Sequence, residues 1–172
     1  AIAAAYALES GYADKVLIID WDLHHGNGTQ NAFYNDNRVV YLSCHQSPFF
    51  PGTGRADERG GGQAEGHIIN RPLSFGQSDE DIITFLDESL LHIETFFKPD
   101  LVCISAGFDA HQSDPIGSMQ MTDAGFYKLT ELAARFAQKH CNGRIVSMLE
   151  GGYASKALGE CVYQHVMCLL KH

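Results

Sequence analysis

The sequence predicts an α/β fold in which a mainly parallel β-sheet carries helices on both faces. Two observations favour this fold class. Short runs of β-branched and aliphatic residues alternate along the 172-residue chain with longer segments of helical character, and such alternation is typical of parallel βαβ units. The apolar runs are also continuous, as in strands that are buried on both faces of a sheet.

The first part of the chain contains two expected strands and two short helices. The opening segment AIAAAYALES predicts a small-residue helix that ends near Gly11, because glycine is common just beyond a helix terminus. VLIID, residues 16–20, and RVVYLSC, residues 38–44, predict buried strands. Between them, GTQNAFYND is long enough for a short helix.

The middle of the chain begins with a long loop, from Gln46 to Gly66, that contains six glycines and two prolines. Loops longer than about 15 residues are usually functional or disordered. HIINRPL, residues 67–73, predicts a third strand. Pro72 restricts this strand to an edge of the sheet, or is itself at a strand end, because proline has no N–H to donate.

The second half predicts three helices and two strands. Ser78 and Asp81 suit the N-cap and N3 positions of a helix, and apolar residues then recur at helical spacing as far as Phe97. The remaining elements are, in order, a strand at 100–107, a loop at 108–121, a helix capped by Thr122 and ending near His140, a strand and glycine-rich turn at 144–153, and a helix at 154–172.

Composition argues against several classes of protein. A hydrophobic fraction of 45% and a charged fraction of 19% are those of an ordinary globular domain. The net charge of -9 argues against direct binding to nucleic acid. No apolar run approaches the roughly 18 residues of a membrane span, and no signal peptide opens the chain. The five cysteines form no CxxC pair and indicate reduced thiols, so we expect a cytoplasmic protein, or a nuclear one if the source is eukaryotic.

Polar side chains follow four of the predicted strands. The carboxyl ends of parallel strands share one edge of the sheet, and ligands bind beyond that edge. We therefore expect four strand ends to present reactive side chains at this edge: Asp20, Asp22 and His24 after the first strand, Ser43 and His45 after the second, Asp109 and His111 after the fourth, and Glu150 and Tyr153 after the last.

Three of these residues suit a catalytic zinc ion. Side chains alternate along extended backbone, so Asp22 and His24 point to the same side and can bind one ion together. Asp109 is the best third ligand, because it directly follows a buried strand. The competing interpretation is that these carboxylates only cap the following helices. Two such sites on neighbouring strand ends favour the metal. The other histidines are interpreted as surface or packing residues: His45, His67, His92, His111, His140, His165 and His172.

Four motifs occur in order along the chain: DWDLHHGNGTQ, FFPGTG, SAGFDAHQSDPIG and LEGGY. At these separations they resemble the zinc-dependent histone deacetylase family, including its bacterial deacetylase-like amidohydrolases. The resemblance covers essentially the whole chain. It implies the three-layer arginase/deacetylase-like fold, and removal of acetyl or other acyl groups from lysine side chains or related amines.

The resemblance implies a role for each matching residue of the zinc site. Asp22, His24 and Asp109 match the three zinc ligands, in agreement with the choice made from strand position. Tyr153 matches the catalytic tyrosine, whose hydroxyl helps zinc to hold the oxyanion that forms when water attacks the acetyl carbonyl. One donor aimed at such a charge commonly contributes about 3 to 4 kcal/mol.

Phe50, Ile116 and Gly152 match substrate-binding positions of the family. Phe50 would form an aromatic wall of the narrow tunnel for the acyl-lysine chain. Members selective for acetylpolyamines tend to carry an acidic residue at the position of Ile116, so this isoleucine weighs against a polycationic substrate. The implied partner is an acetylated lysine peptide or protein, or a small acetylated amine.

The resemblance further implies a structural monovalent-cation site, normally occupied by potassium, beside the zinc. Asp20, Ser43 and Cys44 match its residues, and carboxylate, hydroxyl and carbonyl oxygens are the hard ligands that such an ion prefers. Asp20 and Asn27 would each also orient a histidine. Asparagine at position 27 resembles the class II-like branch of the family, since the class I branch usually has aspartate there.

Those two histidines belong to a Gly-His-His motif, one acting as general base, that lies upstream of the matched region in the family. The only His-His here is His24-His25, and His25 should point away from the ion. The chain also begins without methionine, inside an expected helix. We therefore expect residues 1–172 to be the carboxyl-terminal portion of a single deacetylase catalytic domain, with the amino-terminal part missing. Alone it should be weakly active or inactive, and its uncovered sheet edge should favour aggregation or homo-oligomers.

Two alternatives stay open at this point. An arginase-type binuclear manganese hydrolase would need further carboxylates to bridge a second metal, whereas DWDLHHG has histidine and asparagine where another aspartate is required. A catalytically inactive module that binds acyl-lysine would not need Tyr153, which argues for an active parent.

Overall fold

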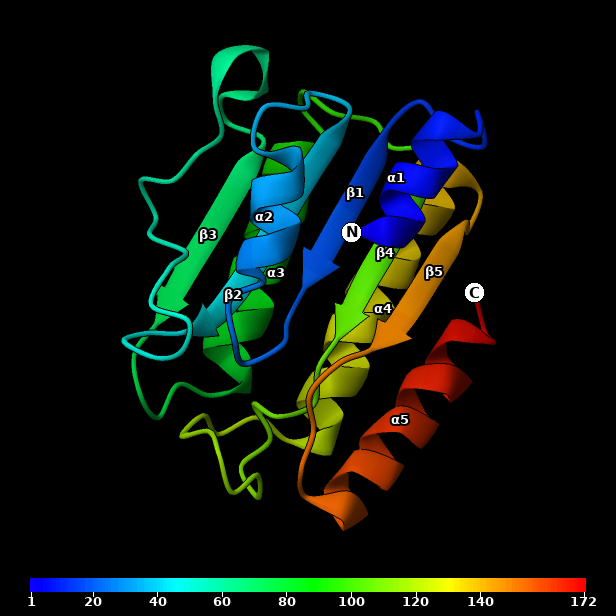
Figure 1. Ribbon diagram of the computed structural model, residues 1–172. Helices are drawn as coiled ribbons and strands as arrows, with labels where there is room; N and C mark the ends of the chain where they lie inside the picture. Colours follow the sequence, from blue (N-terminus) through cyan, green and yellow to red (C-terminus); the bar gives the residue numbers. More distant parts are fainter.

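The computed structural model describes all of residues 1–172 and contains one five-stranded parallel sheet with the strand order β3-β2-β1-β4-β5 (Figure 1). This confirms the predicted α/β fold class. The strands are β1 (Val16–Asp20), β2 (Val39–Gln46), β3 (Ile68–Leu73), β4 (Leu101–Ala106) and β5 (Ile145–Leu149). The helices are α1 (Ile2–Glu9), α2 (Asn27–Phe33), α3 (Asp79–Ile93), α4 (Asp123–Cys141) and α5 (Ser155–Leu169), with a 3₁₀ turn η1 (Gly62–Ala64).

Helices cover both faces of the sheet, so that the molecule has three layers. Figure 1 shows α1 and α2 in front of the sheet and α3 and α4 behind it. Alternate residues of each strand enter different cores: Ile18 and Tyr41 lie in the cluster with α1, whereas Leu17 and Leu42 lie in the cluster with α3 and α4. Full burial of one such aliphatic side chain contributes about 2 kcal/mol, which explains why the strands are apolar on both faces.

Capping residues define where the two long helices of the rear layer begin. Ser78 and Asp81 form the predicted capping box of α3. Thr122 caps α4, where its Oγ1 accepts a hydrogen bond from the N–H of Gly125 at 3.2 Å. The same hydroxyl donates to Asp79 Oδ2 at 2.6 Å. The beginnings of α3 and α4 are thereby fixed to one another at one end of the sheet.

Strand β2 is longer than the apolar pattern predicted. It continues through His45 and Gln46, because β3 runs beside it and pairs with these residues. Both side chains are buried despite their polarity. Strand β3 is an edge strand, as Pro72 predicted. None of the helices combines the length and the apolar character that a membrane span requires.

Candidate metal centre

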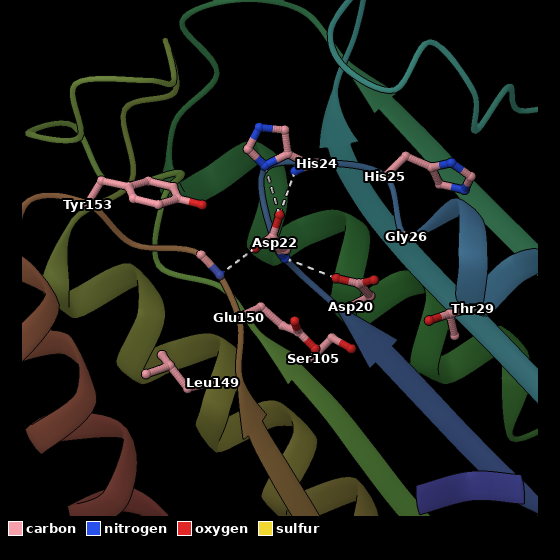
Figure 2. A pocket seen from close by; sticks show the side chains of 11 residues that line it. Asp20, Asp22, His24, His25, Gly26, Thr29, Ser105, Leu149, Glu150 and Tyr153 are labelled. Atoms are coloured by element: carbon pink, nitrogen blue, oxygen red, sulfur yellow. Dashed lines mark hydrogen bonds and ion pairs between the residues drawn. The ribbon is translucent and has the colours of Figure 1, made fainter. Parts of the chain in front are cut away.

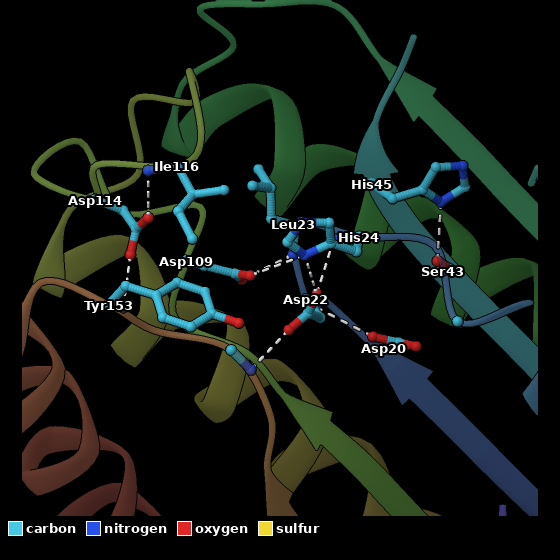
Figure 3. A network of polar contacts seen from close by, with 12 residues as sticks. Asp20, Asp22, Leu23, His24, Ser43, His45, Asp109, Asp114, Ile116 and Tyr153 are labelled. Atoms are coloured by element: carbon cyan, nitrogen blue, oxygen red, sulfur yellow. Dashed lines mark hydrogen bonds and ion pairs between the residues drawn. The ribbon is translucent and has the colours of Figure 1, made fainter. Parts of the chain in front are cut away.

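The carboxyl ends of β1 and β4 bring three potential metal ligands together, as the strand positions predicted. His24 Nδ1 lies 3.1 Å from Asp22 Oδ1 and 3.1 Å from Asp109 Oδ2. The three ligand atoms all lie within 4.8 Å of one another. Figure 3 shows both carboxylates turned toward the His24 ring. Ligands about 2.0 to 2.1 Å from a tetrahedral zinc ion lie about 3.3 Å apart, so these spacings are close to those of a zinc site.

Main-chain hydrogen bonds hold both carboxylates in place. The N–H of His24 donates to Asp22 Oδ1 at 2.8 Å, and the N–H of Gly151 donates to Asp22 Oδ2 at 2.8 Å. The N–H of Leu23 donates to Asp109 Oδ1 at 2.9 Å. The two carboxylates are therefore oriented by main-chain N–H groups of residues that follow β1 and β5, not by flexible side chains.

The environment of the remaining oxygen, Asp109 Oδ2, indicates that a cation binds between these three residues. It is buried and has no hydrogen-bond partner. Burial and the neighbouring Asp22 carboxylate raise the pKa of Asp109 to about 6. A buried carboxylate oxygen without a donor is unfavourable unless a cation satisfies it. One nitrogen and two carboxylate oxygens suit zinc, and a fourth position would stay open.

Two glycines keep this space free of side chains. A Cβ atom at Gly151 would lie 2.2 Å from Asp109 Oδ2 and 2.7 Å from Asp22 Oδ2. A Cβ atom at Gly107 would lie 2.3 Å from Asp22 Oδ2. Both residues therefore have to be glycine for the two carboxylates to converge as they do.

A hollow of about 380 Å³ opens beside the ligands. Asp20, Asp22, His24, Glu150 and Tyr153 are among its lining residues (Figure 2). The Tyr153 ring is largely exposed, and its hydroxyl points toward the ligand group (Figure 3). Partial burial and the Asp109 and Asp22 carboxylates raise the pKa of Tyr153. The phenol therefore stays protonated and can act as a hydrogen-bond donor.

The predicted cation-site residues also lie together. Asp20 and Ser43 are direct neighbours in the β1–β2 register, and the Cys44 thiol contacts the main-chain oxygen of Asp20 at 4.0 Å. Asp20 accepts hydrogen bonds from the N–H of Asp22 at 3.1 Å and from the Tyr41 hydroxyl at 2.9 Å. Burial raises the pKa of Asp20 to about 8, so an adjacent cation would stabilise its ionised form.

His45 orients the Ser43 hydroxyl, a role that the sequence did not reveal. Burial lowers the pKa of His45 to about 4, so its ring is neutral. Its Nε2 donates to the carbonyl of Gly54 at 2.9 Å, which leaves Nδ1 to accept from Ser43 at 3.0 Å. The oxygen lone pairs of Ser43 then remain free for a cation.

The His25 ring packs against that of His45, with ring centres 4.7 Å apart, and points away from the metal ligands, as predicted (Figure 2). Its two ring nitrogens contact Thr53 Oγ1 at 2.7 Å and Gln30 Oε1 at 2.9 Å. Gln30 in turn donates to Glu58 at 2.6 Å. This network fixes the long loop between β2 and β3, which carries Phe50.

None of the predicted substrate-binding residues lines the hollow itself, although Gly152 lies between the lining residues Gly151 and Tyr153. Phe50 is 76% exposed, and its ring centre lies 6.3 Å from that of His24. The neighbouring Phe49 is closer, at 5.4 Å, and was not predicted. Ile116 is exposed, and Gly152 has a φ of +144°, which favours glycine. Asn27 is exposed at the start of α2.

A second group of potential ligands, His111, Asp123 and Cys161, has a different explanation. His111 Nδ1 accepts a hydrogen bond from the N–H of Ser113 at 3.0 Å, so the ring proton lies on Nε2, where a metal would need a lone pair. That nitrogen lies 3.4 Å from Asp123 Oδ1, which also accepts from the Cys161 thiol at 3.1 Å. The group connects the loop after β4 with α4 and α5.

Comparison with known proteins identifies the family. The sequence model of the protein family described as "Histone deacetylase domain" matches residues 1–169. The chain belongs to the histone deacetylase family. Among curated relatives of this family, the chain is 45% identical over 154 residues to the protein named "Probable deacetylase" of Archaeoglobus fulgidus, a match that covers 90% of this chain and 43% of that protein. It is 41% identical over 170 residues to "Histone deacetylase 14, chloroplastic" of Arabidopsis thaliana, covering 99% of this chain and 40% of the relative.

A solved structure confirms the arginase/deacetylase-like fold. The HD domain of HDA15 superposes with a TM-score of 0.86 at 38% identity, covering 98% of this chain and 48% of that one. This histone deacetylase family chain thus spans less than half of the length of each of these three relatives.

Proposed function

We propose that this chain supplies the zinc-binding part of an amidohydrolase site that removes acetyl or other acyl groups from lysine side chains or related amines. The convergence of Asp22, His24 and Asp109 around a buried, unpaired carboxylate oxygen carries the proposal. Membership of the histone deacetylase family supports the same reaction. Zinc held by these residues would polarise the amide carbonyl and activate water.

The residues of this chain would bind and orient the substrate. Tyr153 donates its hydroxyl hydrogen bond to the oxygen of the attacked carbonyl as negative charge develops there. Phe50, Ile116 and Gly152 form the walls along which the acyl-lysine chain enters. Because Ile116 brings no charge to the entrance of the site, we favour an acetylated lysine peptide or a small acetylated amine over a polycation as substrate.

We further propose that the general base lies outside residues 1–172, and that these residues are the carboxyl-terminal portion of one catalytic domain. His25 is engaged at both ring nitrogens by Thr53 and Gln30, and His45 by Ser43 and Gly54. Neither ring therefore has a nitrogen free to take a proton from a water molecule in the hollow. The hollow beside Asp20 and Tyr153 leaves space for an added histidine, which Asp20 would help to orient.

Potassium would occupy the neighbouring site formed by Asp20, Ser43 and Cys44. The raised pKa of buried Asp20 and the free lone pairs of Ser43 support this assignment. Its function would be structural, because it would hold the end of β1 from which Asp22 and His24 project.

Metal content and turnover test the proposal together. Inductively coupled plasma mass spectrometry should find one zinc ion per chain, reduced by Asp109→Asn and unchanged by the control Asp123→Asn. Two manganese ions per chain would instead support an arginase-type hydrolase. In the full-length protein, hydrolysis of an acetyl-lysine peptide should fall about 100-fold or more in Tyr153→Phe. Peptide binding with no turnover in the unmutated full-length protein would support an inactive binding module.

A further inference from the structure

Asp114 lies in the loop after β4, five residues beyond Asp109, and connects two parts of the site. Its carboxylate is buried. Oδ2 accepts a hydrogen bond from the main-chain N–H of Tyr153 at 2.7 Å, and Oδ1 accepts one from the N–H of Ile116 at 2.9 Å (Figure 3). One carboxylate therefore fixes the backbone of Tyr153 and of Ile116 at the same time.

The Tyr153 side chain has little else to hold it. The residue is 53% exposed, and its hydroxyl makes no hydrogen bond within the chain. It follows Gly152, whose φ of +144° is accessible to glycine and unfavourable for other residues. The direction of the phenol therefore depends on how the backbone on either side of Gly152 is fixed.

Two carboxylates fix that backbone. Before Gly152, the N–H of Gly151 donates to Asp22 Oδ2 at 2.8 Å, and its carbonyl accepts from the N–H of Phe108 at 2.8 Å. After Gly152, the N–H of Tyr153 donates to Asp114. The flexible glycine is thus held between two carboxylates: that of Asp22, a proposed metal ligand, and that of Asp114, which is not a metal ligand.

The loop that carries Asp114 is itself held by hydrogen bonds, so the position of this carboxylate is fixed. The N–H of Asp114 donates to the carbonyl of His111 at 2.8 Å. The His111 ring is held by Ser113 and lies beside Asp123 at the start of α4. Further along, the N–H of Ser118 donates to the buried Gln46 side chain at 2.9 Å.

We propose that Asp114 is a positioning residue that aims the Tyr153 hydroxyl at the metal centre and sets its separation from Ile116. The proposal rests on the function proposed for Tyr153. A carboxylate suits the task because both of its oxygens accept hydrogen bonds and neither donates. In Asp114→Asn, one of the two N–H groups would face an amide NH₂ group and lose its acceptor.

Kinetics on the full-length protein test the proposal. Asp114→Asn should lower kcat about 10- to 100-fold with little change in KM for an acetyl-lysine peptide. In a Tyr153→Phe background, the same substitution should have less than about a twofold further effect, because the hydroxyl that it positions is already absent. An undiminished loss in that background would overturn the proposal, since it would indicate a general structural role. Asp123→Asn, which perturbs the same loop without contacting Tyr153, is the matched control.

Amide hydrogen exchange provides a readout that does not depend on turnover. Measured by NMR, exchange of the Tyr153 N–H should rise at least about tenfold in Asp114→Ala, which removes both acceptors, while the Gly151 N–H stays protected. Unchanged protection of Tyr153, or equal loss at both amides, would overturn the proposal. If Tyr153→Phe retained full activity, the role of Tyr153 would fail, and the exchange data would still show whether Asp114 holds its backbone. If Asp114→Asn does not fold, Asp114→Glu, which keeps both acceptors and moves them by one methylene group, is measured in the same way.

Discussion

The Nδ1 atom of His24 lies 3.1 Å from Oδ2 of Asp109, a fully buried oxygen that has no hydrogen-bond donor. Asp22 approaches the same nitrogen at 3.1 Å. Three electronegative atoms at this spacing repel one another unless a cation or a proton lies between them. Burial and the Asp22 carboxylate raise the pKa of Asp109 to about 6, so a cation bound here would stabilise its ionised form.

Replacing Asp109 with asparagine should abolish tight zinc binding. The change keeps the oxygen that accepts from Leu23 and replaces the buried oxygen that faces His24. We expect zinc affinity to fall by at least about 100-fold, because loss of a ligand should exceed the effect of losing a supporting contact. Competition with a chromophoric chelator measures the affinity. Asp123→Asn, in the second ligand group, should bind zinc as the unmutated chain does.

Removal of the metal should lower the thermal stability of the unmutated chain. A ligand present at about 1,000 times its Kd stabilises the folded state by about 4 kcal/mol. A chelator should therefore decrease the Tm of the unmutated protein, measured by calorimetry, and leave the Tm of Asp109→Asn almost unchanged. Equal sensitivity of both proteins to the chelator would place the metal elsewhere.

Gly151→Ala should separate metal binding from folding. Its Cβ atom would lie 2.2 Å from Asp109 Oδ2, so the two carboxylates could no longer converge. We expect zinc content to fall strongly while circular dichroism still shows a folded chain. Gly159→Ala in α5 is the control, because a Cβ atom there meets nothing within 4 Å. It should retain zinc and increase helix stability by about 0.5 to 1 kcal/mol.

His165 should make the protein less stable in mild acid. Burial lowers the pKa of His165 from 6.5 to about 4, and the ring is enclosed between Thr130 at 2.7 Å and Ser147 at 2.8 Å. Below pH 6.5 the unfolded chain takes up a proton that the folded chain accepts only near pH 4. The stability due to this residue is therefore complete above pH 6.5 and decreases as pH falls toward 4, by about 3 kcal/mol.

Denaturant unfolding at several pH values tests this dependence. The fluorescence of Trp21 is a convenient signal, because Trp21 is the single tryptophan and its ring centre lies 5.9 Å from that of His165. In His165→Gln the slope of unfolding free energy against pH between 4 and 6.5 should become smaller. An identical slope in both proteins would contradict the assignment.

The isolated chain should self-associate through the open edge of the sheet. Strand β5 pairs only with β4, and its Val146 and Leu149 are 41% and 59% exposed. An unpaired strand with exposed apolar residues favours contact with a second chain. Sedimentation velocity should show association that increases with concentration and decreases in Leu149→Lys. A monomer at all concentrations would refute this prediction.

Some features of this protein follow from sequence alone because they are local or repeat with a fixed period. Continuous apolar runs identify buried strands, Ser78 and Thr122 mark the beginnings of helices, and Pro72 indicates an edge strand. The parallel arrangement then places every strand's carboxyl end at one edge. For this reason Asp22, His24 and Asp109 could be selected as candidate ligands, although Asp109 lies 87 positions beyond Asp22.

Other features were decided by the tertiary structure. The bond from Tyr153 to Asp114 spans 39 residues, and the contact of His25 with Thr53 spans 28. These contacts join loops whose conformations have no periodic pattern, and each depends on how several elements pack at once. The sequence by itself determined which strand ends meet and hence which residues are candidates to hold a metal. Only packing decided which carboxylate holds the Tyr153 backbone, because neither residue type nor spacing distinguishes Asp114 from the other acidic residues of the loops.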